Sequence, residues 1–540
     1  MSKSKLTVEF NEKKIDAIFA EVDQCRLPGA AVGIAINGKP VYRKGFGLAN
    51  MELPVALSPS IRMRIHSTTK HFACLAYMLL CEEDKAGIDD ELGKYLPELH
   101  PVTHKVTLRQ LMGNVSGLRD SYELAWQFSG YFSSASSSDL LSFYRDVDDV
   151  NFAPGTNWSY NNGGFMLLTL VIERITRQAL EDVLRERIFE PLGMHDTLLR
   201  RFNTDFVPNS ATMHMVTSSG SYDRSYLGVD LSGAGGIVST VDDMLRWLTH
   251  MDAPCVGSAA TWELMKTPQL LANGTSTGYG LALYRDRYGG IDTLYHAGGG
   301  MGANSQMLKV PAAGLDIAIM VNRQDLNAQS LTHKILDACL PGLEPVKAVT
   351  SWPFPSKVFY SPTTGCVIQL GSAASSTVWT IEGQRIASIN GADIPIEPDS
   401  DGVFRPAGSS SFMKLGMMLV GDPEHPTAIQ FSDYGMPDNL VSVQPVQTPD
   451  VRAIEGHYRS ESTGTQLTIL GDEGGPRLNS IGRFGSVKFP LECLGQDIWR
   501  AKPAIPALAG YNAILLFDRN HTELRVSSGR NRMQRFRRCA

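Results

Sequence analysis

Ser67 and Lys70 are spaced so that one side chain can activate the other. Residues at positions i and i+3 lie on the same side of a helix, and the apolar run 72–80 that follows predicts a buried helix. A serine hydroxyl is a weak nucleophile until a base takes its proton, and burial would lower the pKa of Lys70 enough to make it that base. At a helix start, Ser67 would also benefit from free N–H groups that favour negative charge. A capped helix with a solvated lysine has the same spacing, so this interpretation depends on partner residues elsewhere.

Tyr160 and Asn162 supply a second pair of candidate side chains, where the loop 154–159 enters a predicted helix. A phenol can act as general base or acid if a nearby ammonium stabilises its anion, and Lys70 could do this for Tyr160. The amide of Asn162 could hydrogen-bond both Lys70 and a substrate carbonyl. The alternative is a helix N-terminus with an asparagine cap and a buried tyrosine.

His296 ends a predicted strand and is followed by a glycine run that includes Gly299. The histidine could orient the substrate or share a proton with Tyr160. The glycines permit close backbone approach, so the N–H groups of Gly299 and Ser67 could form an oxyanion hole. The alternative is a structural histidine at a strand end, whose ring nitrogens make hydrogen bonds within the protein. A dinucleotide-binding glycine loop is rejected, because that motif requires a following helix and residues 304–310 have a strand pattern.

Two structural layers are expected to position these residues. The chain predicts a helix over 11–25, a hairpin with an Asn-Gly turn over 31–46, a mainly helical block over 66–250, strands over 279–284, 293–296, 305–310 and 315–321, and a helix over 328–339. This order predicts an α/β fold in which an antiparallel sheet, flanked by helices, faces a separate helical lobe across a cleft. We assign it to residues 1–342.

The pattern changes after Cys339, where Pro341, Pro345, Pro353, Pro355 and Pro362 predict a stiff linker. Short strands then alternate with turns to the end of the chain, which predicts two small antiparallel β-barrels over 343–447 and 448–540. The similar segments 364–370 and 463–470 suggest an internal duplication. The C-terminal arginines alternate with Met533 and Phe536, which favours a final strand with a basic outer face over a binding tail.

The chain resembles the serine β-lactamase and penicillin-recognising superfamily, and most closely its D-aminopeptidase branch. The motifs S-x-x-K, Y-x-N and H-x-G of that superfamily match this sequence at Ser67/Lys70, Tyr160/Asn162 and His296/Gly298. The other matching segments are Asn114–Asp120, Phe189–Met194, Gly233–Thr240, Gly456–Ser460 and Phe489–Leu491. The resemblance implies a β-lactamase-like catalytic domain followed by two barrels. It also implies an acyl-enzyme on Ser67, with proton transfer shared by Lys70 and Tyr160, and a D-stereospecific aminopeptidase or amidase activity.

The sequence departs from the superfamily pattern at two places. Most penicillin-recognising enzymes have K-T-G where this chain has His296, and a neutral imidazole binds a substrate carboxylate less well than lysine. Penicillin hydrolysis and carboxypeptidase activity are therefore less expected. In the D-aminopeptidase branch a loop of the last barrel senses the substrate amine. We assign that loop to 481–488, where Arg483 and Lys488 would bind the substrate and disfavour a free ammonium group; Asp472, Glu473 or Glu492 are alternative contacts.

The composition restricts the partners. With 43% hydrophobic residues, 20% charged residues and a net charge of −6, the chain is typical of a soluble protein without a nucleic-acid or anionic-membrane partner. Eight scattered cysteines indicate reduced thiols and neither a disulfide framework nor a metal site. No segment has the apolar character of a signal peptide or a membrane span, so we expect a cytoplasmic location.

These observations predict a serine hydrolase without cofactor or metal that acts on a small-molecule or short-peptide substrate. A homodimer is compatible with the sequence. An esterase or acyl-transferase on the same scaffold remains open. A non-catalytic binding protein is disfavoured, because it would not need both Ser67 and Lys70.

Overall fold

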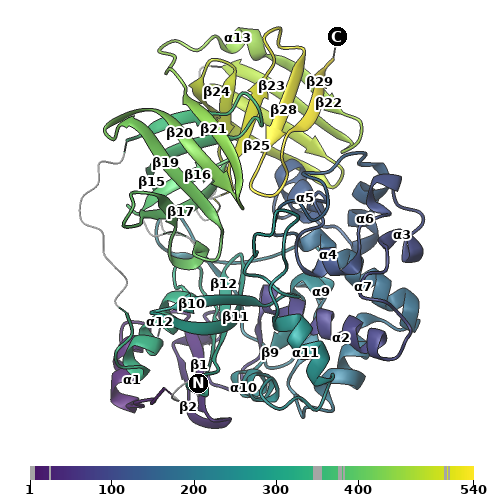
Figure 1. Ribbon diagram of the computed structural model, residues 1–540, viewed down its shortest axis with the longest axis vertical. Helices are drawn as coiled ribbons and strands as arrows, with labels where there is room; N and C mark the ends of the chain where they lie inside the picture. The colour runs from purple at the N-terminus through teal and green to yellow at the C-terminus, as the bar shows by residue number, and fades with distance from the viewer. Residues whose placement is uncertain are drawn as a thin grey trace.

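The computed structural model describes residues 6–23, 26–344, 355–374, 380, 383–472, 474–503, 508 and 511–539. Residues 345–354 of the predicted proline linker and the alternative contact Glu473 lie outside these residues. Two regions stand out in Figure 1: a mixed helix-and-strand region that contains the N-terminus, and a pair of β-barrels above it. The first corresponds to the predicted catalytic region and the second to the two predicted barrels.

A six-stranded antiparallel sheet forms the base of the catalytic region, with the strand order β10-β11-β12-β13-β1-β2. Its strands are β1 Ala30–Ile36, β2 Lys39–Phe46, β10 Tyr284–Tyr288, β11 Ile291–Gly300, β12 Ala303–Val310 and β13 Leu315–Val321. The Asn-Gly turn joins β1 to β2 as predicted, with left-handed φ angles of 50° and 75° at Asn37 and Gly38. The predicted strand 279–284 is wrong: the chain turns at Ala282, where φ is 57°, and the strand starts at Tyr284.

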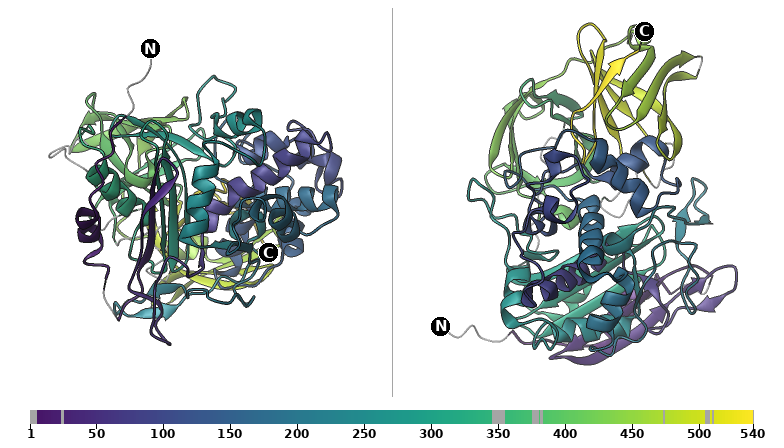
Figure 2. Two further views of the ribbon diagram at one scale, coloured as in Figure 1. Left: turned by 90° about the horizontal axis from the view of Figure 1, so that it is seen from below. Right: turned by 90° about the vertical axis from the view of Figure 1, so that its right-hand side faces the viewer.

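Helices cover both faces of this sheet and build the adjoining lobe (Figure 2). On one face lies α12 with α1 packed on it; α10 contacts the opposite face. The helices are α1 Glu12–Phe19, α2 Lys70–Glu82, α3 Leu92–Tyr95, α4 Leu108–Met112, α5 Ser121–Ser129, α6 Ser137–Asp146, α7 Asn162–Thr176, α8 Leu180–Leu184, α9 Ser232–Gly235, α10 Val241–His250, α11 Ala259–Lys266 and α12 Ala328–Cys339. The short helix α13 Val451–Ile454 lies beside the second barrel instead. The first eleven residues of α2, 70–80, are all buried, so this helix forms the centre of the core. None of the helices in the described residues has the length and apolar character needed to cross a membrane.

Two closed antiparallel barrels follow, and each contains eight strands within the described residues. The first barrel consists of β14 Lys357–Tyr360, β15 Val367–Ser372, β16 Arg385–Ile389, β17 Ala392–Pro398, β18 Phe404–Pro406, β19 Leu415–Asp422, β20 His425–Asp433 and β21 Met436–Ser442. The second consists of β22 Gly456–Ser460, β23 Thr465–Asp472, β24 Gly475–Gly482, β25 Gly485–Gly495, β26 Ile498–Ala501, β27 Ala513–Phe517, β28 Glu523–Ser527 and β29 Gln534–Arg538. The predicted fold class is confirmed. Because α5 packs against β24 and β25, the second barrel is docked on the helical lobe.

Ser67 lies on a short 3₁₀ turn, η1 His66–Thr69, that is held against strand β11. A Cβ atom on Gly298 would lie 2.0 Å from the Ile65 carbonyl oxygen. The hydroxyl of Ser305 on β12 donates a hydrogen bond of 2.8 Å to that same oxygen. The glycine run therefore permits the close contact that fixes Ser67 relative to the edge of β11.

Gly298→Ala should separate β11 from η1, because the added methyl group has no room beside the Ile65 carbonyl. We expect a loss of about 1–3 kcal/mol in the free energy of unfolding, the usual cost of overpacking, measured by urea denaturation, together with a loss of activity. Gly371→Ala is the matched control, since a Cβ there meets no atom within 4 Å. Equal unfolding midpoints for the two variants would contradict the role given to Gly298.

Candidate active site

Lys70 and Ser67 are in direct contact at the start of α2. The Lys70 Nζ atom lies 3.0 Å from Ser67 Oγ, 2.8 Å from Asn162 Oδ1 and 2.6 Å from the carbonyl oxygen of Ala234. The amide and carbonyl oxygens can only accept hydrogen bonds. A neutral amine has two N–H donors for them and one lone pair, which is left facing the Ser67 hydroxyl. The geometry therefore fits a lysine that accepts the serine proton.

The surroundings of Lys70 favour this neutral form. Its side chain is fully buried, and burial, together with the positive charge of Arg530, holds the Lys70 pKa well below its usual value. Asp120 is the described carboxylate that acts in the other direction and raises the Lys70 pKa. Ser67, on the turn that leads into α2, is partly exposed to the pocket, which leaves its hydroxyl open to a substrate.

Tyr160 lies beside this pair, with the Lys70 Nζ atom 4.8 Å from the centre of its ring. Its hydroxyl is buried and makes no hydrogen bond with the described residues, although Ser67 Oγ is close enough to lower the Tyr160 pKa. Burial is the larger effect and raises that pKa, so the resting phenol is protonated. A protonated phenol next to the serine can donate a proton to a leaving group.

His296 is buried as a neutral imidazole with both ring nitrogens engaged. Its Nδ1 atom lies 2.6 Å from the Ala297 carbonyl oxygen and must donate to it, which leaves Nε2 to accept from the Tyr279 hydroxyl at 3.2 Å. Burial lowers the His296 pKa to about 3. The prediction that His296 shares a proton with Tyr160 is not supported, because the contact is between rings with centroids 6.3 Å apart. The geometry indicates a residue that positions Tyr279.

Asn162 and Gly299 both line the pocket with Ser67. Asn162 is the first residue of α7, and its backbone N–H donates to Asp120 Oδ2 at 3.2 Å. Its side-chain oxygen is bound to Lys70, as predicted. The oxyanion hole formed by the N–H groups of Gly299 and Ser67 remains a prediction.

The assignment of Arg483 and Lys488 to the site is wrong. Arg483 pairs with Asp146 at 2.7 Å and lies over the ring of Phe143, both on the outer helix α6. Lys488 is exposed on β25, and neither residue lines the pocket. The turn between β24 and β25 packs on the end of α5 instead, because Gly482 and Gly485 allow it to contact the backbone there. Glu492, one of the alternatives, pairs with Arg500 and Lys502 outside the pocket.

A different segment of the second barrel reaches the site: the loop between β28 and β29, residues 528–533. Arg530 and Arg532 from this loop line the pocket, together with Glu123 of α5. The alternation of the C-terminal arginines with Met533 and Phe536 predicts both Arg530 and Arg532 on the basic face of a final strand. That description fits Arg535 and Arg537, which are exposed on β29, but not the two arginines that precede the strand. Arg530 and Arg532 lie an even number of positions before Phe536, so in a continuous strand they would share its inward face. This spacing was the signal that could have separated them from Arg535 and Arg537.

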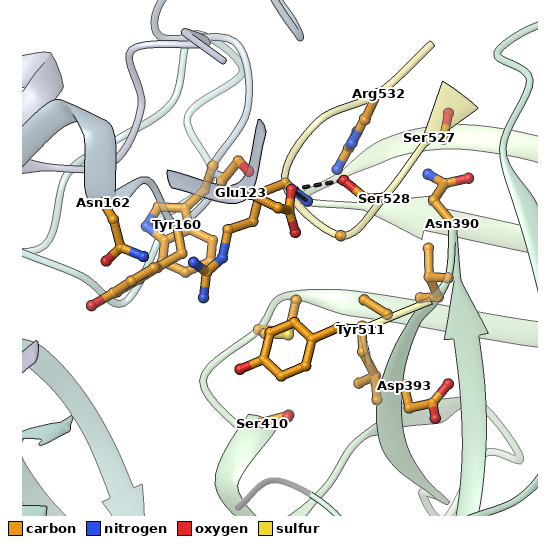
Figure 3. A pocket seen from close by; sticks show the side chains of 18 of the residues that line it. Glu123, Tyr160, Asn162, Asn390, Asp393, Ser410, Tyr511, Ser527, Ser528 and Arg532 are labelled. Carbon is orange, nitrogen blue, oxygen red and sulfur yellow. Dashed lines mark hydrogen bonds between the residues drawn. The ribbon is translucent and has the colours of Figure 1, made fainter. Parts of the chain in front are cut away.

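The pocket has a volume of about 550 Å³ and is shared by all three regions. Figure 3 shows Tyr160 and Asn162 on the catalytic side, across the cavity from Ser410, Asp393 and Tyr511 of the barrels. Aromatic contacts join the regions around it: Trp158 packs on Phe412 and Tyr434, with ring centroids 5.6 and 5.7 Å apart. The barrels therefore form one wall of the site.

Within the described residues, no group of three or more His, Cys, Asp and Glu side chains is arranged to hold a metal ion. The described cysteines are all free.

Residues 15–340 match the family described as Beta-lactamase, and this match covers more than half of the chain. The chain belongs to the beta-lactamase family, and the predicted resemblance to the serine β-lactamase superfamily is confirmed.

Relatives extend the similarity beyond the catalytic region. A D-aminopeptidase of Brucella melitensis is 28% identical over 486 residues, which are 87% of each chain. Two solved structures share the fold: a D-amino acid amidase from Ochrobactrum anthropi (TM-score 0.52, 22% identity, 61% of this chain and 98% of the other) and an octameric penicillin-binding protein homologue from Pyrococcus abyssi (TM-score 0.55, 18% identity, 98% and 100%). The Brucella and Pyrococcus proteins resemble this chain through the barrels as well.

Asn162→Asp should raise the Lys70 pKa, because it places a negative charge 2.8 Å from Nζ in place of a neutral oxygen. An opposite charge this close shifts a pKa by about 1–3 units. The lysine would then stay protonated to higher pH, so the acid limb of the kcat/KM profile should move upward. Asn162→Ala is the control, since it removes the hydrogen bond without adding charge. An unmoved acid limb in the aspartate variant would exclude Lys70 as the titrating base.

Proposed function

We propose that this protein is a serine hydrolase that cleaves amide bonds of small D-amino acid peptides or amides through an acyl-enzyme on Ser67. The observation that carries the proposal is the 3.0 Å contact between Ser67 Oγ and a buried Lys70 whose other donors are already bound. Preference for D-amino acid substrates rests on the D-aminopeptidase relatives, and the pocket volume of about 550 Å³ suits a small molecule or a short peptide.

The residues suggest a complete proton path. Ser67 Oγ attacks the substrate carbonyl and transfers its proton to Lys70, while the N–H groups of Ser67 and Gly299 stabilise the oxyanion. As the C–N bond breaks, Tyr160 gives its proton to the departing amine, and the Lys70 ammonium restores it. A water molecule then attacks the ester carbonyl, its proton passes to Lys70, and Ser67 leaves with a proton from that lysine.

An esterase or an acyl-transferase would use the same steps, with an ester as substrate or with an amine or alcohol in place of water. The residues around Ser67 do not distinguish these two activities from amide hydrolysis. The D-aminopeptidase and D-amino acid amidase relatives favour amide hydrolysis. We also infer that this protein forms a homo-oligomer, since the octameric homologue aligns with nearly the whole chain. The smallest homo-oligomer would be a homodimer. The free cysteines suit a reducing compartment such as the cytoplasm.

Ser67→Ala should abolish both turnover of D-aminoacyl p-nitroanilides and covalent labelling by a fluorophosphonate, because Ser67 is the hydroxyl that contacts Lys70 Nζ among the described residues. Intact-protein and peptide mass spectrometry measure the label. Ser159→Ala is the matched control, since Ser159 lines the same pocket and should leave labelling unchanged. A label that persists on another serine in Ser67→Ala would refute the assignment.

Lys70 and Tyr160 should behave as one unit, because the proton that one accepts is returned by the other. Lys70→Ala and Tyr160→Phe should each lower kcat by about 10²–10⁴, the usual contribution of general acid–base catalysis. The double variant should cost little more than either alone, since members of one unit are not additive. Tyr222→Phe, outside the pocket, should retain full activity, and additive losses in the double variant would show independent roles.

A further inference from the structure

Arg530 projects from the second barrel to the catalytic tyrosine. Its Cζ atom lies 5.1 Å from the centre of the Tyr160 ring, the same ring that has Lys70 Nζ at 4.8 Å. Arg530 is also the largest charge effect on the Lys70 pKa. A group one or two residues from a carbonyl bound at Ser67 is within reach of this guanidinium, because an extended residue spans about 3.3–3.6 Å.

The loop that carries Arg530 is firmly attached to the catalytic region. The buried side chain of Asn531 accepts the Asp120 backbone N–H at 2.8 Å and donates to the Asp120 carbonyl at 3.1 Å. Ser528 Oγ and the Arg530 backbone N–H both donate to Glu123 Oε2, at 2.7 and 2.9 Å (Figure 3 shows the first of these). Asn151 donates to the Arg530 carbonyl at 2.7 Å. Such anchoring presents the side chain at a fixed place in the pocket.

The charge of Arg530 is only partly balanced. Within the described residues its guanidinium makes one hydrogen bond, from Nη1 to Asp120 Oδ2 at 3.3 Å, which is long for an ion pair. Asp120 also accepts the N–H groups of Tyr122, Asn162 and Gly163, at the N-termini of α5 and α7. Each helix N-terminus carries about half a positive charge, so the two together offset most of the Asp120 charge.

The other charged groups nearby do not change this balance much. Arg532 forms an ion pair with Asp433 at 3.1 Å, and Asp433 in turn accepts from Asn157. Burial raises the pKa of the Glu123 carboxyl to about 7, so much of it is uncharged near neutral pH. Arg530 is therefore the cation in this part of the pocket with donors left for a ligand.

We propose that Arg530 determines substrate specificity by binding a carboxylate group that the substrate carries one or two residues from the scissile carbonyl. This inference rests on the proposed hydrolase function. The planar guanidinium offers parallel N–H donors that match the two oxygens of a carboxylate. The same charge disfavours a substrate with a free ammonium at that place.

Two pairs of substrates test the carboxylate preference on either side of the scissile bond. N-succinyl-D-alanine p-nitroanilide is compared with its neutral N-acetyl analogue, and N-acetyl-D-alanyl-D-alanine with its C-terminal amide. We expect the anionic member of at least one pair to have the higher kcat/KM, and Arg530→Gln to lower that ratio by about 10- to 100-fold, the value of a charge-assisted hydrogen bond. Ratios are compared because loss of Arg530 also raises the Lys70 pKa and would slow every substrate alike.

Matched variants separate this effect from a general loss of function. Arg530→Lys keeps the charge without the planar fork and should retain part of the ratio, while Arg537→Gln, exposed on the same barrel, should retain all of it. D-Alanine p-nitroanilide, with its free ammonium, should be the poorest p-nitroanilide for the wild type and improve in Arg530→Gln. Equal ratios in wild type and Arg530→Gln, or a wild type that prefers the ammonium substrate, would overturn the proposal.

Binding of the four substrates of the two pairs to Ser67→Ala is measured by calorimetry. This measurement tests the carboxylate preference separately from the proposed hydrolysis. If no substrate is turned over by the wild type, the hydrolase proposal fails. The carboxylate preference still stands if Ser67→Ala binds the anionic member more tightly and the further change Arg530→Gln removes the difference, and it falls if the four affinities are equal.

Discussion

Desolvation of Lys70 is the interaction on which the site depends. The ammonium form would need compensation for its charge, but the oxygens that contact Nζ are all neutral: the hydroxyl of Ser67, the amide of Asn162 and the carbonyl of Ala234. Arg530 adds a second cation nearby, which makes protonation less favourable still. The energetic penalty of burying a charge is thus what turns an ordinary lysine into a base for Ser67.

Asp120 connects this local chemistry to the architecture. Its carboxylate accepts from the first turns of α5 and α7, and its backbone is held by Asn531 of the second barrel. Tyr160 and Asn162 precede and begin α7, while Glu123 lies on α5, so one buried carboxylate fixes several walls of the pocket at once. The barrels consequently form part of the pocket wall, and the loop 528–533 places Arg530 and Arg532 in its lining.

The local motifs were predictable because their spacing reflects short-range geometry. A serine and a lysine three residues apart must share a helix face, and glycines after His296 permit the approach of Ile65. The misassigned residues all depended on contacts between distant segments. Arg483 has suitable chemistry, yet Asp146 and Phe143 bind it outside the pocket. A proton shared between His296 and Tyr160 is not supported, because Tyr279, seventeen residues earlier, occupies the second nitrogen of His296.

The sequence by itself indicated most of the sheet, the two barrels and the three motifs around Ser67, because periodicity and spacing act along the chain, and those motifs carried the resemblance to the family. Only the tertiary structure decided which loop of the second barrel enters the cleft. That choice depends on how the barrel docks on α5, where Gly482 and Gly485 contact one end of the helix and Asn531 binds the Asp120 cap at the other. Docking is a sum of contacts between segments some 400 residues apart, and no local pattern records it.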